Sequence, residues 1–112
     1  MLMTVQEIED HVTKIILSGK LDINGSLEID KDFMDTIKSK KYVIVDMAEV
    51  SFIMSLGMRT LVSGAKEVAK NSGKLVICNP QSNVEDALRE SSIDTLLPIV
   101  DSNTDLKKLF GL

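Results

Sequence analysis

Two continuous apolar runs, residues 42–47 and 75–78, constrain the fold of this chain more than any other feature. A strand that is buried on both faces has this pattern, and such strands are typical of parallel sheets covered by helices. Between the two runs, apolar residues recur with the spacing of one helix face, at Met58, Leu61, Val62, Ala65, Val68 and Ala69. The order strand, helix, strand therefore predicts a right-handed βαβ unit.

The segments before this unit predict a hairpin and a first helix. Residues 2–9 and 12–18 have strand character and are joined by a polar turn over 9–11, in which we expect His11 to be solvated rather than to bind a metal. After a loop over 19–26, in which Asn24 or Ser26 would be the cap, a helix is predicted over about 26–39. Its apolar face would contain Leu27, Ile29, Phe33, Met34 and Ile37.

Shorter elements are predicted after the unit. The second helix, over about 56–72, would end with Gly73 at the C′ position. Ser82 and Glu85 have the spacing of a capping box and predict a short helix through Glu90. Residues 96–100 predict an edge strand, because Pro98 cannot donate to a ladder. Residues 102–105 would open a last helix in which three apolar side chains face inward: Leu106, Leu109 and Phe110.

The expected fold is therefore α/β with the element order ββαβαβαβα: a mostly parallel central sheet with an N-terminal antiparallel hairpin. A chain of 112 residues fits one domain, which we place over residues 1–112, and can bury a core without disulfides. Its single cysteine, Cys78, lies inside an apolar run and is expected to be a small buried hydrophobe. We see no signal peptide and no apolar run of ~20 residues, so we expect a cytoplasmic protein without membrane insertion.

Composition and motifs argue against several classes of function. Apolar residues make up 44% and charged residues 27% of the chain, and the net charge of −4 gives no general attraction for nucleic acid. There is no glycine-rich phosphate loop and no cysteine and histidine cluster with metal spacing. Isolated acids such as Asp22 and Asp46 more often cap local backbone groups than act in catalysis. We therefore expect no enzyme activity, no catalytic residue, no cofactor and no metal.

The stretch over residues 50–61 joins a buried strand to the second helix and is the strongest candidate for a functional site. Ser55 stands where a helix cap belongs, and Gly57 would let an anion approach the free backbone N–H groups. Met54 and Leu56 are expected on the solvent side as a small apolar patch. Two interpretations remain open: Ser55 is a plain cap, or it accepts a phosphate whose charge of about −1.5 to −2 repels a partner docked on that patch.

The sequence resembles the STAS domain family, and within it the bacterial anti-sigma-factor antagonists, over essentially its whole length. Four segments in order carry the resemblance: Gly19-Lys20-Leu21-Asp22, Val43-Ile44-Val45-Asp46, Phe52-Ile53-Met54-Ser55-Leu56-Gly57-Met58 and residues 96–101. The resemblance implies a protein that binds an anti-sigma factor, itself a serine kinase, and thereby releases a sigma factor. Phosphorylation of the serine would weaken binding, and a serine phosphatase would reset it.

By the same resemblance the phosphoacceptor is Ser55, and partner contacts are expected from Asp22, Asn24, Met54, Leu56, Gly57 and Arg59. We expect a monomer or weak dimer with no direct contact to nucleic acid. Met54 replaces the aspartate usual before the serine, which favours an alternative: a STAS interaction subunit, signalling or transport-associated, that is not regulated by phosphorylation. A third hypothesis is a sensor of a small ligand or nucleotide, because parallel sheets often bind ligands at their strand ends.

Overall fold

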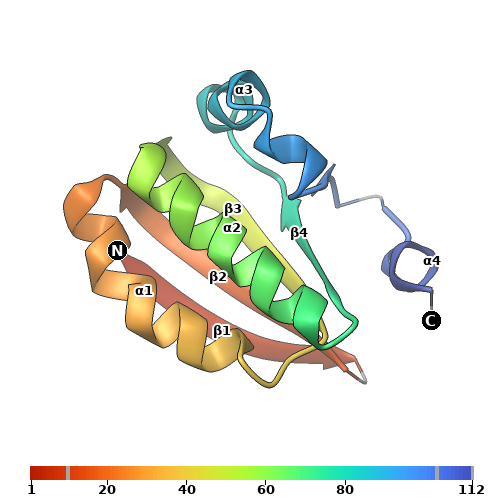
Figure 1. The fold of residues 1–112 in the computed structure, drawn as a ribbon. Coiled ribbons are helices and arrows are strands. Elements are labelled where there is room, and N and C mark those ends of the chain that lie inside the picture. Colours follow the sequence, from red (N-terminus) through yellow and green to blue (C-terminus); the bar gives the residue numbers. More distant parts are fainter. Residues whose placement is uncertain (10, 103, 112) are drawn as a thin grey trace.

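The computed structural model describes residues 1–9, 11–102 and 104–111, and within them it confirms the predicted order of strands and helices. Five strands form one sheet in the order β1-β2-β3-β4-β5 (Figure 1). β1 pairs antiparallel with β2, and the remaining neighbours are parallel. The bounds of the strands are β1 (Leu2–Glu9), β2 (Val12–Leu21), β3 (Tyr42–Ile53), β4 (Lys74–Cys78) and β5 (Ile99–Val100).

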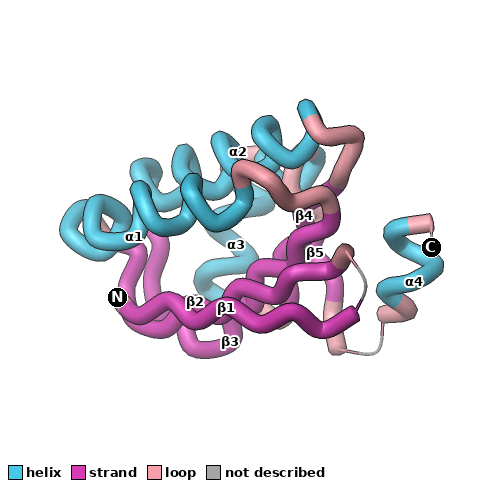
Figure 2. The backbone as a smooth tube through the Cα atoms, turned by 90° about the horizontal axis from the view of Figure 1, so that it is seen from below, coloured by secondary structure: helices cyan, strands magenta, loops and turns pink. Residues whose placement is uncertain are grey.

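Two helices, α1 (Ile23–Ile37) and α2 (Ser55–Lys70), form a layer over one face of the sheet (Figures 1 and 2). Alternate residues of β3 and β4 point to opposite faces, as strand geometry requires. Val43, Val45 and Ile77 join the main core under the helices. Ile44, Val76 and Cys78 join a smaller cluster on the other face, which Phe110 of α4 (Leu106–Phe110) covers. None of the helices in the described residues is both long and apolar enough to cross a membrane.

Two strands continue further than the sequence predicts. β2 runs to Leu21 and β3 to Ile53, and the two residues are register partners. Asp46, predicted to end its strand, lies within β3, where its carboxylate accepts from the Ala48 N–H and lies 3.5 Å from Lys14 Nζ. The strand continues because Val50 and Ile53 are buried against the helices. The start of α2 is consequently fixed by two paired strand ends.

The first helix starts three residues earlier than predicted, and its cap is different. Asp22, not Asn24 or Ser26, is the N-cap, and its carboxylate accepts a hydrogen bond of 2.8 Å from the Gly25 N–H. A side chain at Gly25 would collide with the carbonyl oxygen of Lys20, so glycine is required inside this first turn. Leu27, predicted in the core, is 64% exposed, because Ser26 occupies the buried face instead.

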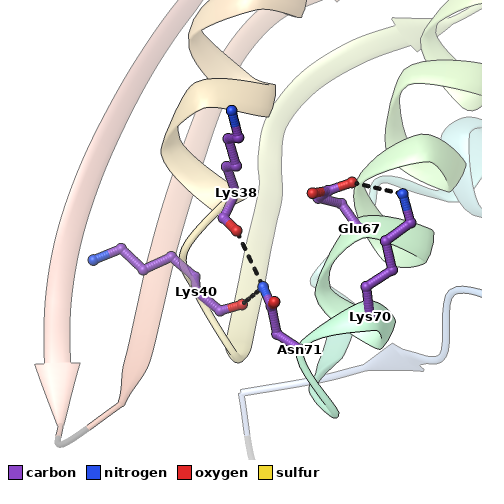
Figure 3. A network of polar contacts seen from close by, with 5 residues as sticks. All are labelled: Lys38, Lys40, Glu67, Lys70 and Asn71. Carbon is purple, nitrogen blue, oxygen red and sulfur yellow. Dashed lines mark hydrogen bonds and ion pairs between the residues drawn. The ribbon is translucent and has the colours of Figure 1, made fainter.

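The second helix also begins one residue early, with Met54 as N-cap and Ser55 as its first residue. At its other end, the Ser72 N–H donates to Ala69 O and the Gly73 N–H to Val68 O, which is a Schellman motif. Ser72, with a φ of 60°, therefore has the C′ role predicted for Gly73. The Asn71 side chain donates to the carbonyl oxygens of Lys38 and Lys40 and so ties this end of α2 to the end of α1 (Figure 3).

The buried face of α2 differs in part from the predicted stripe. Leu61 and Val68 are buried as expected, whereas Ala69 is exposed. The side toward α1 consists of Gly57, Thr60 and Gly64, small or polar residues that a search for apolar periodicity does not find. Gly64 allows the close approach, because a Cβ there would lie 2.6 Å from Phe33 Cε2.

The remaining elements are shorter than predicted or capped differently. α3 (Ser82–Glu90) has the predicted bounds, but its N-cap is Gln81, so Ser82 and Glu85 form no capping box. The predicted strand over 96–100 is reduced to Ile99–Val100, after a turn of 3₁₀ helix over Ile93–Thr95. Asp105 caps α4. Asp10, expected in the hairpin turn, and Asn103, expected near the start of the last helix, lie outside the described residues.

Two expectations for single residues are confirmed. His11 is exposed in the hairpin turn, with a φ of 68°. Cys78 is 9% exposed, and burial, followed by the nearby Asp46 carboxylate, raises the pKa of its thiol.

We predict that Gly64→Ala destabilises the fold. The higher helix propensity of alanine should add about 1 kcal/mol to the unfolding free energy. The added methyl group must, however, push α1 and α2 apart at Phe33, which should lower the unfolding free energy by about 1–3 kcal/mol. The net loss should appear as a lower urea midpoint. Lys66→Ala, an exposed change on the same helix, is the control and should shift the unfolding free energy by less than about 0.5 kcal/mol. An unchanged midpoint for Gly64→Ala would show that the helices are not held at this distance.

A second prediction concerns the two helix starts. Asp22→Ala removes the cap of α1 and should cost about 1 kcal/mol of unfolding free energy. Ser55→Ala should change it by less than about 0.5 kcal/mol, because Met54 holds the cap position. Urea unfolding of both variants beside the unchanged chain measures the difference. If Ser55→Ala costs as much as Asp22→Ala, the serine is a structural cap after all.

Candidate functional site

The candidate site lies where β2 and β3 end and α1 and α2 begin. Leu21 and Ile53 are register partners, and the Met54 N–H donates a 2.9 Å hydrogen bond to Leu21 O just beyond them. The chain segments that follow, Asp22–Ile23 and Met54–Ser55, therefore leave the sheet next to one another. This places the first turns of both helices at one end of the molecule (Figure 1).

Ser55 is exposed at the first position of α2, and its hydroxyl makes no hydrogen bond to any described residue. The first hydrogen bond of the helix runs from the Met58 N–H to Met54 O at 3.1 Å. The N–H groups of Ser55, Leu56 and Gly57 precede it and have no partner within the helix. The serine therefore combines a free hydroxyl with the positive end of a helix dipole.

Arg59 is the nearest cation along the helix. It stands four residues after Ser55, on the same side of α2, and it is exposed. Within the described residues it makes no ion pair, so its guanidinium is available to an anion at Ser55.

Two side chains of the first turns lie differently from the sequence-based expectation. Leu56 was expected in solvent, but it is half buried and faces α1. Thr60 lies outside the predicted apolar stripe, yet it is buried, and its hydroxyl lies 3.3 Å from Asp30 Oδ1 and 3.2 Å from Leu56 O. The expectation failed because it took the apolar stripe as the whole contact face, whereas small and polar residues pack against α1.

Leu56 instead borders a groove of about 290 Å³ between the two helices. From α1 it is lined by Ser26, Leu27 and Asp30, and from α2 by Leu56, Arg59, Thr60 and Ser63. The Ser26 hydroxyl is fully buried at this groove and has no hydrogen-bond partner in the described structure. The groove is thus partly apolar, with a carboxylate and a guanidinium at its rim.

Gly57 has a different role from the one expected. It is buried, and a Cβ there would lie 2.9 Å from Leu21 Cβ and 3.1 Å from Ser26 Oγ. The glycine therefore lets α2 approach β2 and α1, and its Cα side offers no space for a phosphate. Asp22 likewise has a structural task as the cap of α1, while Asn24 is exposed in the first turn of that helix.

The structure adds two apolar residues that the sequence analysis did not assign to the site. Ile23 is 55% and Leu27 64% exposed, and they stand four residues apart on one side of α1. Met54 is 39% exposed at the neighbouring helix start. We call these three residues, together with Ser55 and Arg59, the Ser55 surface. The sequence does contain a signal for Ile23. Aspartate is a favoured N-cap residue, so Asp22 predicts a helix that begins at Ile23, whereas the sequence analysis placed Ile23 in a loop.

No group of three or more potential metal-binding side chains comes together in the part of the chain that the structure describes. The chemistry of the Ser55 surface is instead that of a free hydroxyl beside a cation, bordered by exposed apolar side chains. This arrangement can bind a partner and can carry an anion.

Comparison with known proteins gives relatives of similar length. BtrV of Bordetella bronchiseptica, whose name describes it as an anti-sigma factor antagonist, is 22% identical over 103 residues, which cover 91% of this chain and 88% of BtrV. A crystal structure from Thermotoga maritima, also described as such an antagonist, matches with a TM-score of 0.85 at 19% identity, covering 98% of this chain and 95% of the other.

The anti-sigma factor antagonist SpoIIAA of Bacillus is similar in both of its forms. The unphosphorylated form matches with a TM-score of 0.79 at 17% identity, covering 99% of this chain and 98% of SpoIIAA. The phosphorylated form matches with a TM-score of 0.71, covering 96% of each chain. Likeness at this level of identity establishes the fold. The family model described as STAS domain matches residues 3–106, and the chain therefore belongs to the STAS domain family.

Proposed function

We propose that this chain is an anti-sigma-factor antagonist that binds its anti-sigma factor through the Ser55 surface and is switched off by phosphorylation of Ser55. The observation that carries the proposal is the position of Ser55: exposed, without a hydrogen-bond partner among the described residues, and at the first position of a helix in a STAS domain. The names of the relatives BtrV and SpoIIAA support the class of partner.

The fold can accept a phosphate at Ser55. The phosphate would bring about −1.5 to −2 charges and three acceptor oxygens next to the free N–H groups at the start of α2. The helix dipole favours an anion there by about 0.3–1 kcal/mol, and the Arg59 guanidinium lies on the same side of the helix. Since the hydroxyl makes no hydrogen bond to the described residues, phosphorylation breaks no hydrogen bond among them.

A bound partner would not accept the same phosphate. Ile23, Leu27 and Met54 are exposed apolar side chains, so a partner that covers them must itself be largely apolar at this place. A phosphate in that contact would have to lose most of its water, and the single positive charge of Arg59 would not match its charge of about −1.5 to −2, which is costly. Phosphorylation can therefore act as a switch without any conformational change in the chain.

The partners follow from this scheme. The anti-sigma factor is also the serine kinase that adds the phosphate, and a serine phosphatase removes it. Binding of the unphosphorylated chain releases the sigma factor in the cytoplasm, and the chain itself contacts no nucleic acid. Of the residues expected at the contact, Asn24, Met54 and Arg59 are exposed, and Leu56 contributes at the edge of the groove.

One observation favours a second candidate function. Met54 stands where the family commonly has an aspartate before the serine. With its neutral side chain at the N-cap, the chain would be a STAS interaction subunit that binds its partner permanently and is not phosphorylated.

The first test separates these two functions. Incubation with the cognate anti-sigma-factor kinase and ATP should add one phosphate, detected by intact mass spectrometry, and Ser55→Ala should abolish the addition. Ser82→Ala is a matched control, because Ser82 is also exposed at the first position of a helix whose N-cap side chain makes no capping hydrogen bond. Partner binding without any phosphate transfer would support the permanent subunit instead.

The second test concerns the contact itself. Ser55→Glu and Leu27→Asp should each weaken binding to the anti-sigma factor by more than about tenfold, or 1.4 kcal/mol, in calorimetry, while the melting temperature stays nearly unchanged. Leu96→Asp is the control, because Leu96 is similarly exposed but lies after the 3₁₀ turn, outside the Ser55 surface. Equal affinity of Leu27→Asp and the unchanged chain would show that the partner docks elsewhere.

A further inference from the structure

The groove between α1 and α2 has walls of opposite charge. Figure 1 shows the two helices side by side. The groove of about 290 Å³ between them is lined by Asp30 from α1 and by Arg59 from α2. Both side chains are exposed, and within the described residues neither makes an ion pair with the other or with a further residue. An occupant of this groove would therefore meet a carboxylate on one wall and a guanidinium on the other.

Each wall adds a hydroxyl group one helical turn away from its charge. On α1, Ser26 stands four residues before Asp30, and on α2, Ser63 stands four residues after Arg59, so each pair lies on one side of its helix. The Ser26 hydroxyl is fully buried at the groove and has no hydrogen-bond partner in the described part of the chain. Because buried polar groups of folded proteins normally have a partner, we expect the missing one to come from a molecule that enters the groove.

We propose that the groove between α1 and α2 binds a free amino acid with a branched apolar side chain. The ammonium group of this ligand would lie at the α1 wall, beside Asp30 and Ser26, and its carboxylate at the α2 wall, beside Arg59 and Ser63. A zwitterion supplies both charges that the walls require. A ligand with a single charge would leave one wall unmatched and would be repelled by the other.

The size and the apolar lining of the groove fit this class of ligand. Its volume of about 290 Å³ lies at the lower end of the range of about 300–1,000 Å³ that is typical of ligand pockets, which favours a small ligand over a nucleotide. Leu27 is exposed and Leu56 is half buried, so an aliphatic side chain of the ligand could cover both. The Thr60 hydroxyl, 3.3 Å from Asp30 Oδ1, orients that carboxylate from the opposite wall.

The inference does not rest on the proposed function. Ser55 does not line the groove, so binding of an amino acid requires neither a phosphate nor a kinase. Leu27 and Arg59 belong both to the groove and to the Ser55 surface, so a bound amino acid would alter the surface that a partner meets. Ser55→Ala should bind the amino acid as the unchanged chain does, and either proposal can therefore fail without the other.

Calorimetric titration of the full chain with L-leucine tests the proposal. We expect saturable binding with a Kd of about 1 mM or lower. Two analogues of leucine each lack one charge: 3-methylbutylamine has no carboxylate, and 4-methylpentanoate has no ammonium group. Each should bind about tenfold more weakly than leucine, because it loses the charged hydrogen bonds to one wall. A titration without saturable binding of leucine, or an analogue that binds as tightly, would overturn the proposal.

Single substitutions test whether the groove is the binding site. Asp30→Asn and Arg59→Gln should each weaken leucine binding about tenfold, whereas Asp32→Asn, an exposed change on α1 outside the groove, should not. Leucine that binds equally well to Asp30→Asn or Arg59→Gln must lie elsewhere, which would contradict the proposal.

Ser26→Ala separates a role in binding from a role in the fold. It should weaken leucine binding about threefold to tenfold without lowering the urea midpoint, because the hydroxyl has no partner among the described residues of the free chain. A lower midpoint with unchanged leucine binding would show that a water molecule satisfies the hydroxyl and that it serves the fold alone. The proposed contact with the ligand would then be wrong.

Discussion

The structure depends on the close approach of α2 to α1 and to the end of β2. Gly57 and Gly64 are the two places where α2 has no side chain, and Leu21, Ser26, Phe33 and Ile37 fill the space that a Cβ would need. The hydrogen bond from the Met54 N–H to Leu21 O fixes where the helix starts. At the far end, the Asn71 side chain joins the two helices through the carbonyl groups of Lys38 and Lys40 (Figure 3).

Because of this packing, some residues in the first turns of α2 stabilise the fold, and others remain accessible to a partner. Gly57 and Thr60 face inward and hold the helix against α1, whereas Ser55 and Arg59 face solvent and make no polar contact with the described residues. A side chain that the fold does not use can be modified at little cost in stability. The exposed Ile23 and Leu27 belong to the neighbouring helix start, so a partner at Ser55 would contact both helices at once.

Much of the fold could be predicted because it is set by local periodicity. The apolar runs of β3 and β4 and the spacing of Leu61 and Val68 identify strands and a helix without any knowledge of their neighbours. The ends of the elements were predicted less well. Asn24 and Gly25 resemble a loop, yet they belong to α1, because Asp22 caps the helix and the Lys20 carbonyl lies where a side chain at Gly25 would be. The position of Ser55 at the start of a helix was close to correct, although Met54 has the cap position.

By itself, the sequence determined the α/β class, the order of the elements and the importance of the segment around Ser55, because these follow from residue spacing along a single chain. Only the tertiary structure decided what surrounds that serine. Leu27 is exposed, Thr60 is buried, and Gly57 faces the core, because these outcomes depend on how closely two helices approach each other. That distance is set by small residues, which leave no signal in a pattern of apolar side chains.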